Sequence, residues 1–200
     1  MVVSLLLGVC AQASSAFVNV PPANPCGGVY QNPDQSYSVK LPRSIPVVPV
    51  YQFYSIYMQD YFWTISEDEK DQIVENYRTG KDTYQYQGIA GFVEENSAAW
   101  NVPVYRFWNK ETMDHFYTAS EAEKDTLART LKDGTDHYVY EGIAWYAPTN
   151  DGVPVYRFFD RNAFNHYYTS STDEYQDLSA QYLAGTSPFR YEGIGWNWYE

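Results

Sequence analysis

The residues with the clearest chemical potential are arginines and glutamates, which recur as two pairs at equivalent places: Arg106 with Glu141, and Arg157 with Glu192. A third equivalent place has Gln52 and Gln87, so both members of the pair change together. Direct contact explains this, because a buried charge that loses its partner is costly, whereas two amides keep their hydrogen bonds. An arginine and a carboxylate in a cleft could also serve catalysis, but we expect structural ion pairs.

Asp114-His115 and Asn165-His166 form a second recurring pattern, with Asp60-Tyr61 at the equivalent place. Asp, Asn and His side chains could hydrogen-bond sugar hydroxyls, and neighbouring aromatic rings could stack on a sugar. The candidate ligand-binding residues on this hypothesis are Trp108, Asn109, Asp114, His115, Asp160, Asn165, His166, Trp145 and Trp196. The alternative is structural: Asp and Asn fix a hairpin turn, histidine fills a half-buried place that tyrosine also fills, and the rings belong to the core.

Metal-binding and catalytic patterns are weak. The chain has three histidines, of which His137 has no repeated counterpart, and it lacks an HExxH motif and paired cysteines, so we expect no zinc site and no cofactor. Asp60, Asp114 and Asn165 could meet around a calcium ion, but such a set is a weak signal. Since there is no Gly-x-Ser-x-Gly motif and no phosphate-binding glycine loop, we assign no catalytic residue and favour a protein that is not an enzyme.

These residues belong to an internal repeat. Pro-Val-Tyr begins at positions 49, 103 and 154, and Gly-Ile follows at 88, 142 and 193. The proline-to-glycine separation is 39 in every copy (88 − 49 in the first), whereas successive copies start 54 and then 51 residues apart. Length therefore changes only between copies, as expected when each copy is a packed unit and the connections are surface loops. We place the units at 49–102, 103–153 and 154–200, within a single domain.

Each unit is predicted to contain strand, strand, helix and strand. Alternating residues in Val104–Trp108 and Asp114–Thr118 predict a hairpin. Ser120 and Glu123 then form a capping box that begins a helix, and in every unit a glycine 14 residues after the cap serine ends it. A third strand follows at Tyr138–Tyr146. The predicted fold is α+β and β-rich: three tandem β-β-α-β repeats closed around a pseudo-threefold axis, trefoil-like or three-bladed, because an open stack would expose aromatic strand edges.

The N-terminal part differs from the repeats. Residues 1–16 combine an apolar run with small residues, which predicts a signal peptide and a secreted, extracellular protein. Residues 17–48, rich in Pro, Asn, Gly and Ser, predict an extended arm. Once the signal is removed, Cys26 is the one cysteine left, which could link a dimer. The net charge of −12 argues against nucleic acid, and the apolar run is too short to insert across a membrane.

The segment from Val104 to Ala144, with its VYRFW, DHFYT, SEAE and YEGIA motifs, resembles the repeat of a family of secreted bacterial and fungal proteins, the domain of unknown function DUF5648. The resemblance extends over residues 47–200. It implies an extracellular setting, often beside secreted hydrolase domains, but no agreed activity. The first unit departs from the family pattern at Gln52, Tyr61 and Gln87.

Triplication favours binding over catalysis, because an active site usually needs one asymmetric set of groups, whereas repeated weak sites gain avidity. We therefore expect a secreted, non-catalytic, lectin-like module that binds carbohydrate on a cell wall or glycan surface through up to three shallow sites. The alternatives are an extracellular matrix or protein-interaction domain and, third, a secreted hydrolase.

Overall fold

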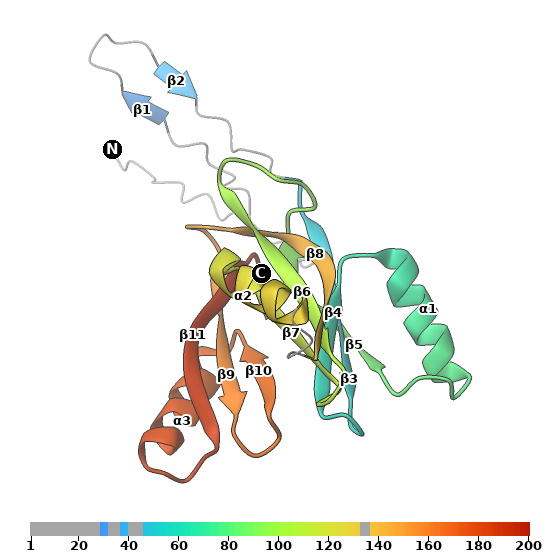
Figure 1. Ribbon diagram of the computed structural model, residues 1–200. Helices are drawn as coiled ribbons and strands as arrows, with labels where there is room; N and C mark the ends of the chain where they lie inside the picture. The colour runs from blue at the N-terminus through green and yellow to red at the C-terminus, as the bar shows by residue number, and fades with distance from the viewer. Residues whose placement is uncertain (1–28, 32–36, 40–45, 133–136) are drawn as a thin grey trace, which may run out of the picture.

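The chain folds into three units with the same order of elements, strand, strand, helix, strand, in a computed structural model that describes residues 29–31, 37–39, 46–132 and 137–200 (Figure 1). The first unit comprises β3 (Val48–Ser55), β4 (Asp60–Thr64), α1 (Glu67–Arg78) and β5 (Gln85–Val93). The second comprises β6 (Asn101–Asn109), β7 (Asp114–Thr118), α2 (Glu121–Lys132) and β8 (Tyr138–Pro148). The third comprises β9 (Val153–Asp160), β10 (Asn165–Thr169), α3 (Thr172–Leu183) and β11 (Phe189–Trp198).

These elements confirm the predicted β-rich α+β class and the three β-β-α-β repeats. Ahead of the units, β1 (Val29–Gln31) pairs with β2 (Tyr37–Val39) in an antiparallel two-stranded sheet. The predicted signal peptide at 1–16 and Cys26 lie outside the described residues, as does most of the predicted arm at 17–48.

Each unit has its first strand in the middle of a three-stranded antiparallel sheet, in the orders β4-β3-β5, β7-β6-β8 and β10-β9-β11. Because side chains alternate between the faces of a strand, Val104 points to one face of its sheet and Tyr105 and Phe107 to the other. The latter two pack with Phe116, and Leu127 of α2 packs against this group. The helix therefore covers the outer face of the sheet.

The helix ends follow the predicted signals. The hydroxyl oxygens of Ser66 and Ser171 accept hydrogen bonds from the backbone N–H three residues on, at the starts of α1 and α3. Gly80 has a φ of 72° and Gly185 a φ of 73°, the left-handed conformation that ends a helix without strain when the residue is glycine. The third predicted helix end, Gly134, lies outside the described residues.

The inner faces of the three sheets meet in one hydrophobic core. β4, β7 and β10 contact one another in every pairing, and so do β5, β8 and β11. The buried residues of this core are Val50, Trp63, Val93, Val104, Tyr117, Trp145, Ala147, Val155, Tyr168, Trp196 and Trp198. Where the other units have Trp145 and Trp196, the first unit has Gly91. A Cβ at Gly91 would lie 2.7 Å from the Trp198 ring, so Trp198 occupies that space.

Tyrosine hydroxyls bind the backbone of the neighbouring unit inside this core. The Tyr117 hydroxyl accepts a hydrogen bond from the Trp63 N–H (2.9 Å) and donates to the Trp63 carbonyl (3.0 Å). The Tyr168 hydroxyl makes the same two bonds, of 2.9 and 3.0 Å, with the backbone of Tyr117. Buried backbone groups need such partners, so these hydroxyls let the edges of β4 and β7 face the core.

The third strands are also joined from unit to unit. Glu94 and Tyr146 exchange two backbone hydrogen bonds of 2.9 Å, and Tyr199 and Phe92 exchange two of 2.7 and 2.8 Å. At the equivalent place between the second and third units stands Pro148, which has no N–H. There the side-chain amide of Asn197 donates to the Pro148 carbonyl (3.3 Å). Each unit therefore touches both of the others.

We expect Tyr117→Phe to lower the free energy of unfolding by about 2 kcal/mol, because it leaves a buried N–H and a buried carbonyl of Trp63 without a partner. Urea unfolding followed by tryptophan fluorescence measures this. Tyr57→Phe, at a side chain that is 83% exposed, is the matched control and should change little. Equal effects of the two substitutions would contradict the role given to the Tyr117 hydroxyl.

Candidate functional site

The second strand of each unit begins with a polar residue that points into the neighbouring unit. In β4 this residue is the buried Asp60, which follows Gln59 at the end of the hairpin turn. Gln59 has a left-handed φ of 55°, and Met113 and Phe164, at the same place in the other hairpins, have φ values of 55° and 57°. The three turns therefore share one conformation and direct Asp60, Asp114 and Asn165 in the same way.

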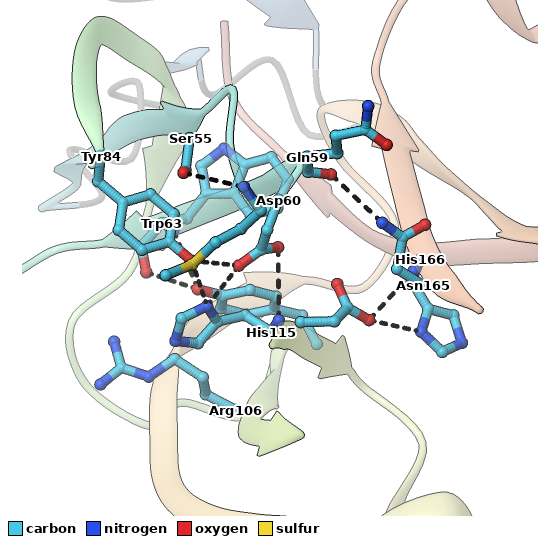
Figure 2. Close-up of polar contacts among 12 residues, drawn as sticks. Ser55, Gln59, Asp60, Trp63, Tyr84, Arg106, His115, Asn165 and His166 are labelled. Atoms are coloured by element: carbon cyan, nitrogen blue, oxygen red, sulfur yellow. Dashed lines mark hydrogen bonds and ion pairs between the residues drawn. The ribbon is translucent and has the colours of Figure 1, made fainter. Parts of the chain in front are cut away.

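These polar residues bind the next unit in order (Figure 2). Nδ1 of His115 lies 2.8 Å from Oδ2 of Asp60, and the Tyr84 hydroxyl donates to the same oxygen. Asp114 accepts from the backbone N–H of His166 (3.1 Å) and lies 3.3 Å from Nδ1 of that histidine. In the third unit, the Asn165 side-chain amide donates to the Gln59 carbonyl of the first unit (3.3 Å).

Burial shifts the pKa values of Asp114 and His166. Asp114 is fully buried, and burial together with the nearby Asp60 carboxyl raises the pKa of Asp114 well above its usual value. Among the described residues, Oδ1 of Asp114 is buried and has no hydrogen-bond partner. Burial, with a smaller contribution from Arg157, lowers the pKa of His166 to about 3. His166 is therefore neutral near pH 7, and the folded protein favours the protonated form of Asp114 more than the unfolded chain does.

The predicted arginine–glutamate pairs are confirmed. Nε of Arg106 lies 2.8 Å from Glu141, and Nε of Arg157 lies 3.1 Å from Glu192. Each glutamate sits at a β-bulge of the third strand, directly before a glycine with a φ of 116° or 119°. A residue with a Cβ is strained at such a φ, so the glycine lets the bulge turn the glutamate toward the arginine.

Each arginine also binds a glutamate of the preceding unit, and the one bound by Arg157 is Glu123 of the predicted capping box. The Arg157 guanidinium donates to Glu123 over 2.9 and 2.7 Å, and Arg106 donates to Glu69 over two distances of 3.2 Å. The backbone N–H of the cap Ser120 is instead bound by Thr118. The glutamate is thus free to cross to the next unit, and its hydrogen bonds from Arg157 lower the pKa of Glu123.

The first unit does not form the predicted pair of amides. The Gln52 side-chain oxygen accepts from the Trp63 indole N–H (3.1 Å), and the Gln87 amide donates to the Gln85 carbonyl (3.1 Å). The predicted hydrogen bonds between the two glutamines are therefore wrong, because the Gln52 and Gln87 side chains bind Trp63 and Gln85 instead.

A cleft of about 440 Å³ opens where the second and third units meet. Its walls are apolar side chains of the second unit, and its polar groups are the Arg157 network and His166. The lining residues are Phe116, Ala122, Glu123, Thr126, Leu127, Tyr138, Arg157, His166 and Glu192. The Arg157 guanidinium lies over the Phe116 ring, 5.1 Å from its centre. Sequence reasoning missed Glu123, Phe116, Leu127 and Tyr138, because periodicity identifies a buried face without identifying its partner.

Comparison with known proteins identifies the family of this chain. The sequence profile of the Domain of unknown function (DUF5648) matches residues 29–134 and 129–200, two adjacent segments, as expected for a repeat domain. The chain belongs to the DUF5648 family. A search of curated proteins and a search of solved structures each found no significant match to this sequence.

In this DUF5648 domain the predicted ligand-binding residues have different surroundings. Trp145 and Trp196 are 1% and 3% exposed in the shared core, which leaves no face for a ligand. Asn109 and Asp160 accept backbone hydrogen bonds within their hairpin turns. Trp108 packs on His115, with ring centres 4.6 Å apart. Of the predicted set, His166 lines the cleft, while Asp114, His115 and Asn165 bind neighbouring units.

The described part of the DUF5648 domain has neither a cluster of metal-binding side chains nor a helix that could span a membrane. No group of three or more His, Cys, Asp or Glu side chains there is arranged to hold a metal ion. In the same residues, no helix combines the length and apolar character needed to cross a bilayer.

We expect Glu141→Ala to lower the midpoint of thermal unfolding by several degrees, because it removes one of the two carboxylates that bind the largely buried Arg106. Glu121→Ala, on the exposed start of α2, is the control and should leave the midpoint nearly unchanged. Differential scanning calorimetry compares the two. Matching midpoints would refute the role of the pair.

Asp114→Asn tests the buried carboxyl. An acid whose pKa is raised on folding contributes its full stability below its unfolded pKa, near 4, and loses it as pH rises. Asparagine avoids this loss and can accept the His166 hydrogen bonds. The variant should therefore gain stability over the wild type as pH rises above 4, by up to about 1.4 kcal/mol per pH unit. Urea unfolding at several pH values measures the difference. A difference that does not vary with pH, or that shrinks as pH rises, would contradict the account.

Proposed function

We propose that this chain is a non-catalytic carbohydrate-binding module whose three units close around a pseudo-threefold axis and whose ligand sites are the clefts between units. We further propose that it acts outside the cell, on the glycan of a cell wall or cell surface. The observation that carries the proposal is the cleft at Arg157, because it combines aromatic and aliphatic walls with hydrogen-bonding groups that remain partly exposed.

Closure is supported by the order of the contacts. Asp60 of the first unit binds the second, Asp114 of the second binds the third, and Asn165 of the third binds the first. The third strands follow the same order, through Glu94 with Tyr146, Pro148 with Asn197, and Tyr199 with Phe92. A cycle of equivalent contacts is what a closed ring of repeats produces, whereas an open stack would leave its two end units apart.

The cleft suits a sugar by its size and its chemistry. A volume of about 440 Å³ lies within the usual range of small-molecule pockets. Phe116 and Leu127 offer apolar surface to the C–H face of a sugar ring. The charged groups of Glu123, Arg157 and Glu192 offer acceptors and donors to hydroxyls, and charged groups form the stronger hydrogen bonds.

The same residue types recur between the first and second units, at Phe62, Glu69, Ile73, Tyr84, Arg106, His115 and Glu141. There one arginine faces two glutamates, whereas Arg157 and Arg190 balance Glu123 and Glu192 at the other junction. Neither group has an excess of positive charge, and the chain as a whole has a net charge of −12. We therefore propose neutral rather than acidic glycans as ligands.

A binding role is favoured over hydrolysis by the state of the glutamates. A glycosidase needs one carboxyl group with a raised pKa to protonate the leaving group. Hydrogen bonds from Arg157 lower the pKa of Glu123 instead, which keeps this group ionised and unsuited to donate a proton. Binding at the cleft and at the equivalent residues between the first and second units would instead give avidity on a polymeric glycan.

The test is a glycan array followed by calorimetric titration with the best neutral oligosaccharide. Thr126 lies on α2 at the cleft, so Thr126→Trp should block this site without removing an ion pair. Gln72→Trp is the equivalent change at the junction between the first and second units. We expect each single variant to lose at least tenfold in avidity on a polymeric ligand, and the double variant to lose binding.

Gln176→Trp, on an exposed part of α3, is the matched control and should bind like the wild type. An array without neutral glycan hits, or tight binding that survives in the double tryptophan variant, would overturn the proposal.

A further inference from the structure

Two of the three junctions between units hold an arginine between an aromatic ring and a carboxylate. Arg157 lies 5.1 Å from the centre of the Phe116 ring and donates two hydrogen bonds to Glu123. Arg106 lies 4.9 Å from the centre of the Phe62 ring and binds Glu69 in the same way. In both cases the arginine comes from one unit, and the ring and the carboxylate come from the preceding unit. The junction geometry therefore forms a place for a cation.

The junction between the third and first units keeps the ring and the carboxylate but lacks the arginine. Tyr167 stands at the place of Phe116, and Glu174 at the place of Glu123. The arginine position is Gln52, whose side-chain oxygen accepts from the Trp63 indole. Glu174 accepts a hydrogen bond of 2.6 Å from the Tyr167 hydroxyl, which is a neutral donor. Among the described residues, no Lys, Arg or His side chain forms an ion pair with Glu174.

Two further tyrosines, Tyr61 and Tyr54, lie next to Tyr167, at the places where the other junctions have histidine and Trp108 or Phe159. Tyr61 lies 6.1 Å from Tyr167, edge to face, and 4.7 Å from Tyr54, measured between ring centres. Burial, with Tyr54 and then Glu174, raises the pKa of Tyr61, and burial followed by the hydrogen bond to Glu174 raises the pKa of Tyr167. The two hydroxyl groups are thus close enough to sense the charge of Glu174. All four side chains remain partly exposed.

We propose that the junction between the third and first units binds a small organic cation of the methylated-ammonium class, held by Glu174 and the rings of Tyr54, Tyr61 and Tyr167. The ligand occupies the place that an arginine of the protein fills at the other two junctions. This site is separate from the glycan clefts and does not depend on them.

The ring content favours methylated ammonium over a metal ion or guanidinium. Aromatic faces attract cations, and quaternary ammonium groups are the ligands that clusters of aromatic rings recognise best, because such cations shed water easily. Guanidinium binds a carboxylate best through two parallel hydrogen bonds, one to each oxygen. Here the Tyr167 hydroxyl already uses Oε1 of Glu174.

The experiment is an NMR titration of the full chain with tetramethylammonium chloride, with sodium chloride as the ionic-strength control and methylguanidinium chloride as the competing chemistry. We expect saturable shifts of the Tyr54, Tyr61 and Tyr167 ring signals, with a Kd on the order of millimolar. Sodium should give no saturation, and methylguanidinium should bind at least tenfold more weakly. Equal responses to all three salts would overturn the proposal, and tighter methylguanidinium binding would overturn its ligand class.

Two variants test the residues. Glu174→Gln keeps an acceptor for the Tyr167 hydroxyl but removes the charge, so the Kd should rise at least tenfold. Gln52→Arg supplies the missing cation from the chain itself and should also abolish binding. Glu121→Gln, an exposed carboxylate on α2, is the control and should leave the Kd unchanged. If Glu174→Gln folds normally and binds tetramethylammonium like the wild type, the proposal is wrong.

Discussion

No unit of this protein can bury the inner face of its own sheet, and the rest of the structure depends on this constraint. Within the second unit, α2 covers the face that contains Tyr105 and Phe107, so Val104, Tyr117 and Trp145 are left on the opposite face. Aromatic side chains of this size carry a large part of the burial energy of a small protein. They find partners only in the other two units, which makes the three repeats one cooperative body.

Bringing three sheets together in this way carries polar groups into the interior. The backbone N–H and carbonyl groups at the buried strand edges need hydrogen-bond partners. The hydroxyls of Tyr117 and Tyr168 are those partners for Trp63 and Tyr117. Two of the three junctions use an arginine, a histidine and a tyrosine from the later unit. The first unit has Gln52, Tyr61 and Trp63 at those places, so all three departures fall on the one junction that joins the third unit to the first. Its chemistry is aromatic where the others are ionic.

Local signals in the sequence were enough to predict the elements. Alternation predicted each hairpin, cap serines predicted helix starts, and Gly80 and Gly185 predicted helix ends, because these depend on neighbouring residues. Correlated change predicted the contact of Arg106 with Glu141, because loss of one charge would leave the other unpaired.

Partners across junctions could not be predicted in this way. Glu123 fits a capping box, yet its carboxylate binds an arginine 34 residues away in the next unit. From the sequence, Trp145 and Trp196 fit both a stacking platform for a ligand and a place in the core. Periodicity identifies an apolar face but not whether protein or ligand covers it. In the structure both rings lie in the core. The glutamines of the first unit illustrate the same limit, since each found a local partner instead of the other.

The central claim, that the three units share one core and fold as one body, is tested most directly by scanning calorimetry of the full chain. Cooperative unfolding of the repeats predicts a single transition whose calorimetric enthalpy equals its van't Hoff enthalpy. Two or three resolved transitions, or a van't Hoff enthalpy near one third of the calorimetric value, would show that the units unfold separately and would contradict the account.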